Sequence, residues 1–169
     1  MDFLETVKQR RSVRRYTSQV PDETLVNTIL ECARLAPSAV NLQPCHYHVV
    51  RSEDMRRKVQ LSYDREWFAT APLYIVVCAD TSVAWTRRED GRSHAAVDAA
   101  IATEHICLAA TALGLGTCWV CNFKPDVLSA ALNLPAHVEP VAIIPLGYAD
   151  ADATRPQQRK PLDEMVTLW

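Results

Sequence analysis

"AAVDAAIATEHICLAATALGLGTCWV" (residues 95–120) contains the stretch around which the rest of the fold must be built. Apolar residues fall on most sides of a helix over 94–113, and "GLG" at 114–116 supplies a stop. Asp98, Glu104 and His105 interrupt the apolar run, which indicates a helix buried within protein and not within a lipid bilayer. Such a helix needs apolar cover on several sides, and the remaining segments have to provide it.

The segments around this helix mix both kinds of secondary structure. Apolar periodicity and capping residues predict further helices over residues 2–10, from Pro21 onward, after Ser52, and over 125–132. Strands are predicted over residues 46–50, 73–79, 117–123 and 139–148. Residues 81–93 resemble a loop, and the polar tail 149–169 is expected to be extended. This mixture indicates an α+β or α/β protein.

Composition limits the classes of protein to which the chain can belong. Its 169 residues predict one domain over 1–169, and the formal charge of -2 argues against a nucleic-acid binder. The N-terminus carries Asp2 and Glu5 and lacks a long apolar run, so a secretory signal is not expected. Without one, the six cysteines are expected to be reduced thiols in the cytoplasm. Neither a membrane nor a nucleic acid is expected as a partner.

Several common catalytic motifs are absent from the sequence. It has no GxGxxG, no Walker A loop, no GxSxG and no HExxH. Cys118 and Cys121 form a lone CxxC, whereas a zinc site normally needs a second pair of ligands, which His94 and His105 are wrongly spaced to supply. We therefore expect packed cysteines and no metal site.

The stretch "QRRSVRRY" (9–16) gathers four arginines around a serine in a chain that is acidic overall. A phosphate monoester carries nearly two negative charges, and the planar fork of an arginine donates to two of its oxygens at once. The hydroxyl group of Ser12 adds a neutral donor. The alternative is a basic surface in which water solvates each arginine separately.

Two further stretches offer polar groups or close approach to the backbone. "PSAVNLQP" (37–44) places Ser38, Asn41 and Gln43 on a loop between two prolines, although it could also be an ordinary helix-to-strand connection. "GLGTCWV" (114–120), together with "PLGY" (145–148), would let a flat ligand approach the backbone, or could simply end a helix.

In this order, the stretches resemble the nitroreductase family of flavin enzymes. The family pattern runs "RRSxRxY/F", "APSxxNxQPW", "APxxIVV", "GLGTCW", "PLGYP" and "RKPL". This chain has "RRSVRRY", "APSAVNLQPC", "APLYIVV", "GLGTCWV", "PLGYAD" and "RKPLDEMV". Cys45 stands where the pattern has tryptophan, and Ala149 where it has proline. The resemblance implies an α+β fold with a central, mostly antiparallel sheet flanked by helices.

The resemblance also implies an FMN site. The phosphate and ribityl chain would be held by Arg10, Arg11 and Ser12, with Arg159 and Lys160 of the tail as further phosphate ligands. Arg14 would lie near the pyrimidine edge of the ring. The implied ring contacts come from two segments: Pro37, Ser38, Ala39, Asn41 and Gln43, and then Gly114, Leu115 and Gly116.

The implied activity is hydride transfer from NADH or NADPH through flavin N5 to a nitroaromatic or a quinone. No side chain is needed as a catalytic acid or base, because the cofactor carries the chemistry. The substrate is expected to meet Trp67, Phe68, Trp85 and Arg92.

The resemblance further implies an intertwined homodimer in which the tail 149–169 wraps the partner subunit. Two alternatives stay open on the same fold. One is a specialised flavin protein that cleaves flavin or removes halogen from aromatic substrates. The other is a dimeric interaction module that has lost its flavin.

Overall fold

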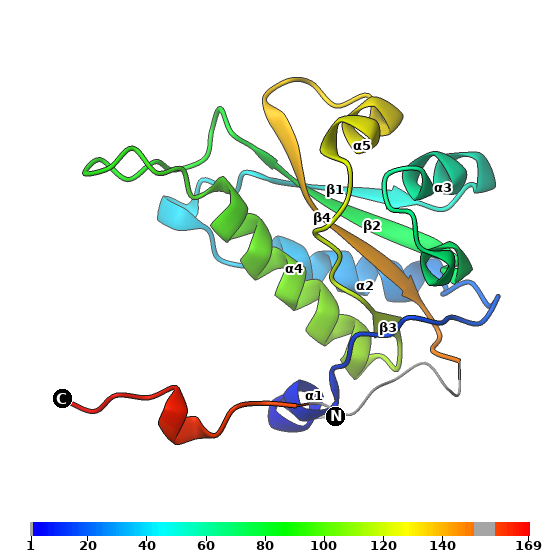
Figure 1. The fold of residues 1–169 in the computed structure, drawn as a ribbon, viewed down its shortest axis with the longest axis horizontal. Coiled ribbons are helices and arrows are strands. Elements are labelled where there is room, and N and C mark those ends of the chain that lie inside the picture. The colour runs from blue at the N-terminus through cyan, green and yellow to red at the C-terminus, as the bar shows by residue number, and fades with distance from the viewer. Residues whose placement is uncertain (1, 151–157) are drawn as a thin grey trace.

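The computed structural model describes residues 2–150 and 158–169 and has a four-stranded antiparallel sheet at its centre (Figure 1). The strand order is β1-β2-β4-β3. The strands are β1 (Cys45–Val50), β2 (Leu73–Asp80), β3 (Gly116–Thr117) and β4 (Val138–Gly147). The helices are α1 (Phe3–Gln9), α2 (Glu23–Arg34), α3 (Glu53–Gln60), α4 (Ala95–Ala112) and α5 (Pro125–Leu132). Three short 3-10 helices follow the same chain: η1 (Ala39–Asn41), η2 (Glu66–Thr70) and η3 (Leu162–Glu164).

Strand β2 lies at the centre of the sheet and is buried on both faces, from Leu73 to Ala79. It pairs with β1 on one side and with β4 on the other, with a register shift between Val77 and Cys78. Burial on both faces explains why "LYIVVCA" is a continuous apolar run without alternation.

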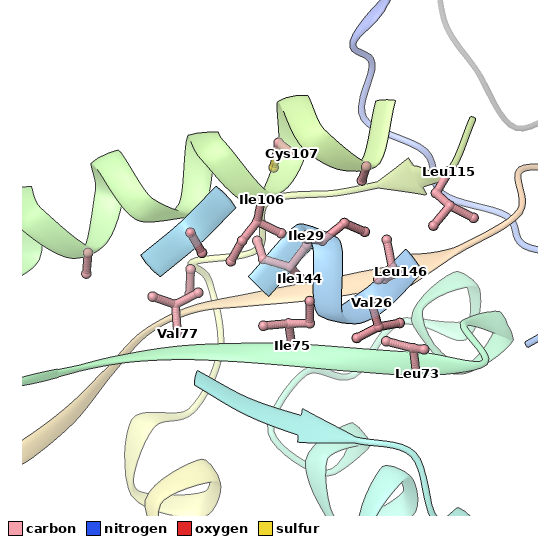
Figure 2. Close-up of a cluster of buried hydrophobic side chains, with 14 of the residues drawn as sticks. Val26, Ile29, Leu73, Ile75, Val77, Ile106, Cys107, Leu115, Ile144 and Leu146 are labelled. Atoms are coloured by element: carbon pink, nitrogen blue, oxygen red, sulfur yellow. The ribbon is translucent and has the colours of Figure 1, made fainter. Parts of the chain in front are cut away.

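Helices cover both faces of the sheet. Helices α2 and α4 pack on one face, where Figure 2 shows Val26 and Ile29 of α2 beside Ile75 of β2 and Ile106 of α4. The other face packs against the segments around α3, η2 and α5, which bury Val59, Phe68 and Leu128. Within the described residues, α4 has the length and composition to cross a membrane, but half of it is buried inside the protein.

The predicted helices are confirmed, α1 and α4 with slightly shorter bounds and α5 with the predicted bounds. Asp2 caps α1 by accepting a hydrogen bond from the Glu5 amide at 2.9 Å, and Ser52 caps α3 through the Met55 amide at 3.4 Å. Residues 81–93 form a loop, as expected.

The strand predicted over 117–123 is wrong for most of its length. Only Gly116 and Thr117 form β3, and Val120 makes one isolated bridge to Ile143 of β4. These pairings share one register, which places Pro145 opposite Cys118. Proline has no amide hydrogen to donate to the ladder, so the strand is interrupted there.

Candidate functional site

The arginine stretch runs directly from α1 along β3. Arg10 ends α1, and its amide donates to the Thr6 carbonyl at 2.9 Å. Ser12 then forms a parallel bridge with Thr117, and the Val13 amide donates to the Thr117 carbonyl at 2.8 Å. The structure therefore brings "RRS" and "GLGT", which lie far apart in the sequence, side by side.

Close packing at Gly116 supports this arrangement. A Cβ atom on Gly116 would lie 2.7 Å from Val13 Cγ2, which is too close for any side chain. A hollow of about 550 Å³ opens beside this contact. Its walls include Arg11, Val13 and the whole of 114–116. Arg11 and the backbone of 114–116 thus line the same space, which Glu5 and Gln9 also line.

The arginines of the stretch have different neighbours. The Arg10 Nε atom lies 3.9 Å from the Glu104 carboxylate of α4, and Arg11 donates to the Lys8 carbonyl at 3.1 Å. The Arg14 guanidinium carbon lies 5.9 Å from the centre of a Trp67 ring, within the range of a cation–π contact. Among the described residues, Arg11 and Arg14 contact a carbonyl group and an aromatic ring, and such contacts leave the positive charge of both side chains in place for an anionic ligand.

The loop 37–44 is held in an unusual conformation. Val40, Asn41 and Gln43 have φ angles of 53°, 58° and 51°. Side chains disfavour this left-handed region, most of all the β-branched side chain of valine. Within the loop, the Gln43 amide donates to Ser38 Oγ at 2.9 Å. The side chains of Asn41 and Gln43 are exposed and available to a ligand.

Asp98, in the first turn of α4, is the functional candidate that the sequence analysis did not assign. Its Oδ1 atom accepts a hydrogen bond from the Ala39 amide at 2.9 Å, and the residue is only 3% exposed. It lines a cavity of about 140 Å³ with Ser38, Gln43 and Cys45. Burial and the Asp98 carboxylate raise the pKa of the Cys45 thiol to about 11. A charge in the first turn of an apolar helix was the one signal available in the sequence.

The two groups of predicted flavin residues lie at opposite ends of α4 (Figure 1). The loop 37–44 is joined to Asp98 near the start of the helix, whereas 114–116 follow its end. From Asp98 to Ala112 the helix rises about 21 Å. The three fused rings of a flavin are shorter than this rise.

The four expected substrate contacts are placed differently from one another. Phe68 is fully buried and lies 4.5 Å from the Tyr74 ring, so its assignment to the substrate wall is wrong. An aromatic ring of that size contributes more to stability inside the core than in a pocket wall. Trp67 is half-buried beside Arg14. Trp85 is half-buried against His94, and Arg92 is exposed on the same loop.

At the start of the tail, Ala149 bridges to Tyr16 and Asp150 pairs with Arg15, whereas residues 158–169 are exposed throughout and lead away from the body of the domain (Figure 1). Arg159 donates to the neighbouring Gln158 carbonyl at 2.8 Å. For Lys160, no hydrogen bond or ion pair is found within 2–150 and 158–169. Residues 151–157 of the expected wrapping tail lie outside the described residues.

The family of this chain follows from its sequence and its fold together. The sequence matches the model of the Nitroreductase family over residues 7–62 and 60–148. The chain belongs to the nitroreductase family. The resemblance carried by the ordered motifs is thereby confirmed, and so is the α+β class with its antiparallel sheet.

Individual relatives agree with this membership. A Methanothermobacter thermautotrophicus (strain Delta H) protein named "Putative NADH dehydrogenase/NAD(P)H nitroreductase" is 36% identical over 161 residues, covering 92% of this chain and 82% of that protein. A Bacillus subtilis (strain 168) protein named "FMN reductase [NAD(P)H]" is 28% identical, covering 92% and 70%. A "5,6-dimethylbenzimidazole synthase" from Rhodospirillum rubrum is 31% identical, covering 99% and 88%.

A solved structure agrees equally well. The crystal structure of a nitroreductase family protein from Clostridium difficile 630 superposes with a TM-score of 0.92 at 34% identity. The superposition covers 99% of this chain and 98% of that one. The present chain is therefore similar to that protein over nearly the full length of both.

Proposed function

We propose that this chain reduces small nitroaromatic or quinone acceptors with electrons from NADH or NADPH, using FMN bound between two copies of the chain. Membership of the nitroreductase family makes it an NAD(P)H-dependent oxidoreductase with FMN as cofactor. One observation carries the rest of the proposal. The arginine stretch packs against Gly116 and is bridged to Thr117, so that Arg11 and the backbone of 114–116 line one hollow.

The residues at this place fit the phosphate end of FMN. The side chains of Arg10, Arg11 and Ser12 can all donate hydrogen bonds. The bridge between Ser12 and Thr117 fixes the backbone from which these side chains extend. Charge-assisted hydrogen bonds from arginine to phosphate are about twice as strong as neutral ones. We expect Arg159 and Lys160 to reach the same phosphate once the tail has a surface on which to lie.

Gly114 and Arg14 would form the ring end of the site. Bound FMN supplies the chemistry, accepting hydride from the nicotinamide and passing it to the acceptor. The Arg14 guanidinium, which lies over the Trp67 ring, would hold the pyrimidine edge of the flavin ring and favour negative charge there. Gly114 permits close approach of a ligand to the backbone because the space around its Cβ position is open, whereas at Gly116 that space is filled by Val13. No acid or base is assigned among the side chains.

The second copy of the chain follows from the length of α4. Because the loop 37–44 and the segment 114–116 lie at opposite ends of that helix, we infer that the loop of one subunit completes the site of the other. A symmetric dimer would then hold two identical composite sites. Exposed apolar side chains support such a dimer: Phe3, Leu4, Leu162, Met165, Leu168 and Trp169. We place the enzyme in the cytoplasm, where its six free cysteines would stay reduced.

The absorption spectrum of the purified protein tests this function. We expect flavin bands that bleach anaerobically on addition of NADH or NADPH and return when a quinone is added. The faster donor identifies the physiological nucleotide. Flavin bands that do not bleach would favour the flavin-cleaving or dehalogenating alternative. A colourless protein that takes up no added FMN would leave a dimeric interaction module.

A further inference from the structure

The loop 38–43 is too strained to keep its shape unaided. Three of its residues have left-handed backbone, and Val40 among them is β-branched. Such conformations persist only where the surrounding structure over-determines them, and they concentrate at ligand sites. A contact with the rest of the chain has to hold the loop in this conformation.

Most hydrogen bonds of the loop are internal. The Asn41 amide donates to the Ser38 carbonyl at 3.0 Å, and the Gln43 amide donates to Ser38 Oγ at 2.9 Å. Internal bonds shape the loop but do not fix it to the rest of the chain. Within the described residues, the bond from the Ala39 amide to Asp98 Oδ1 is the one that joins residues 38–43 to another element.

A buried carboxylate such as that of Asp98 costs more free energy than is needed merely to hold a loop in place. The residue is 3% exposed, and its Oδ2 atom is buried without a partner among the described residues. Burying a carboxylate is costly unless its oxygens are satisfied. The side chain lines the cavity of about 140 Å³ that Ser38 and Gln43 also line, so its free oxygen lies next to the strained loop.

We propose that Asp98 is a positioning residue for the flavin ring, holding loop 38–43 in the conformation that presents Asn41 and Gln43 to it. The inference rests on the proposed function, since the loop is expected to meet the ring and not the phosphate. Asp98 does not touch the reacting atoms. It acts through the Ala39 amide, and substitution of Asp98 should weaken binding of the flavin ring without affecting binding of the phosphate.

A purely structural role makes a different prediction. An acidic residue in the first turn of a helix stabilises that helix by interacting with its dipole. Asp126 occupies the same kind of position in α5, where it is exposed. Asp126→Ala therefore provides a matched control, since it removes a first-turn charge far from any predicted flavin contact.

Titration of the full-length protein with FMN and with riboflavin separates these roles. Riboflavin has the ring without the phosphate. We expect Asp98→Ala to weaken both ligands by the same factor, roughly tenfold for one lost hydrogen bond. Asp98→Asn, which keeps an acceptor oxygen, should retain both affinities within about threefold. Arg10→Ala should weaken FMN alone, and Asp126→Ala neither.

Hydrogen exchange gives a readout that does not depend on flavin. The Ala39 amide should exchange faster in Asp98→Ala than in the wild type, while the middle of α4 exchanges at its usual rate. If Asp98→Ala does not fold, Asp98→Ser takes its place, because the shorter side chain cannot reach Ala39.

Two outcomes would overturn the inference. Equal flavin affinities in the wild type and Asp98→Ala would leave Asp98 as a helix-stabilising residue only. Loss of FMN affinity with riboflavin unchanged would place its effect at the phosphate. A wild-type chain that binds neither flavin would remove the proposed function as well, so the two failures can be told apart.

Discussion

Val13 occupies the space that a side chain at Gly116 would need: a Cβ atom there would lie 2.7 Å from Val13 Cγ2 and 3.0 Å from Val13 Cβ. Together with the hydrogen bond from the Val13 amide to the Thr117 carbonyl, this contact joins the arginine stretch to β3. The position of Ser12 relative to the backbone of Gly116 therefore depends on the absence of a side chain at residue 116.

We expect Gly116→Ala to destabilise the protein by about 1–3 kcal/mol, the usual cost of overpacking. It should also displace Ser12 and weaken FMN binding. Val13→Ala in the same chain should restore part of both losses, because it makes room for the new methyl group. Urea denaturation of the two single variants and the double variant gives the coupling energy.

Gly114→Ala is the control for this cycle. Gly114 has a φ of +75° with open space around the position of a Cβ atom, so the substitution costs backbone strain without a clash. Val13→Ala should leave the cost of Gly114→Ala unchanged. Strictly additive energies for Gly116→Ala and Val13→Ala would contradict the proposed contact.

A composite site predicts complementation between two defective chains. Arg10→Ala damages the phosphate end, and Asn41→Gly removes a loop side chain while relieving its left-handed backbone. Each variant alone should bind FMN weakly. In an equal mixture that exchanges subunits, each mixed dimer has one intact site and one doubly defective site, so about a quarter of all sites should recover.

Flavin fluorescence on mixing measures that recovery, and a cross-linked dimer that cannot exchange is the control. No recovery in a mixture proven to contain mixed dimers would show that both ends of the site come from one chain.

The long-range part of this architecture could not be predicted from the sequence. The α4 helix and the β2 strand could be predicted from the sequence, because their patterns are local and strongly apolar. The early end of the strand predicted over 117–123 could not be predicted, since it depends on Pro145, which lies opposite Cys118 in another strand. Phe68 looked the same as Trp67 in sequence, although only the former is fully buried. The bond from Ala39 to Asp98 spans 59 residues, so no local pattern could reveal it.

Removal of the tail is expected to affect both dimerisation and FMN binding. Truncation before residue 158 removes Arg159, Lys160 and the exposed apolar group Leu162, Met165, Leu168 and Trp169. We expect the shortened chain to be largely monomeric in analytical ultracentrifugation and to contain little FMN. The reason is that it loses both a phosphate contact and the apolar surface that would cover a partner.

Arg159→Ala with Lys160→Ala in the full-length chain separates these two effects. This variant should stay dimeric and lose affinity for FMN but not for riboflavin. A truncated chain that keeps full flavin and remains a dimer would remove the tail from both roles.

The buried thiols predict how stability depends on pH. Burial raises the pKa of Cys78 and of Cys107 from the ordinary value of 9.0 to about 12. In the folded protein these thiols stay protonated, whereas in the unfolded chain they lose their protons above pH 9. Their contribution to stability is therefore complete below pH 9 and is lost as pH rises toward 12. Each thiol should lower the free energy of unfolding by roughly 1.4 kcal/mol per pH unit in this window.

Thermal unfolding between pH 8 and 10.5 measures this slope. Cys78→Ala should lower stability at every pH, through lost packing, but should flatten the decline above pH 9. Val76→Ala, two residues away on β2 and also buried, removes packing without removing a proton and should leave the slope unchanged. Other groups that titrate in this range are present in all three proteins and cancel in the comparison. Equal slopes for wild type and Cys78→Ala would mean that the Cys78 thiol ionises as readily in the folded protein as in the unfolded chain.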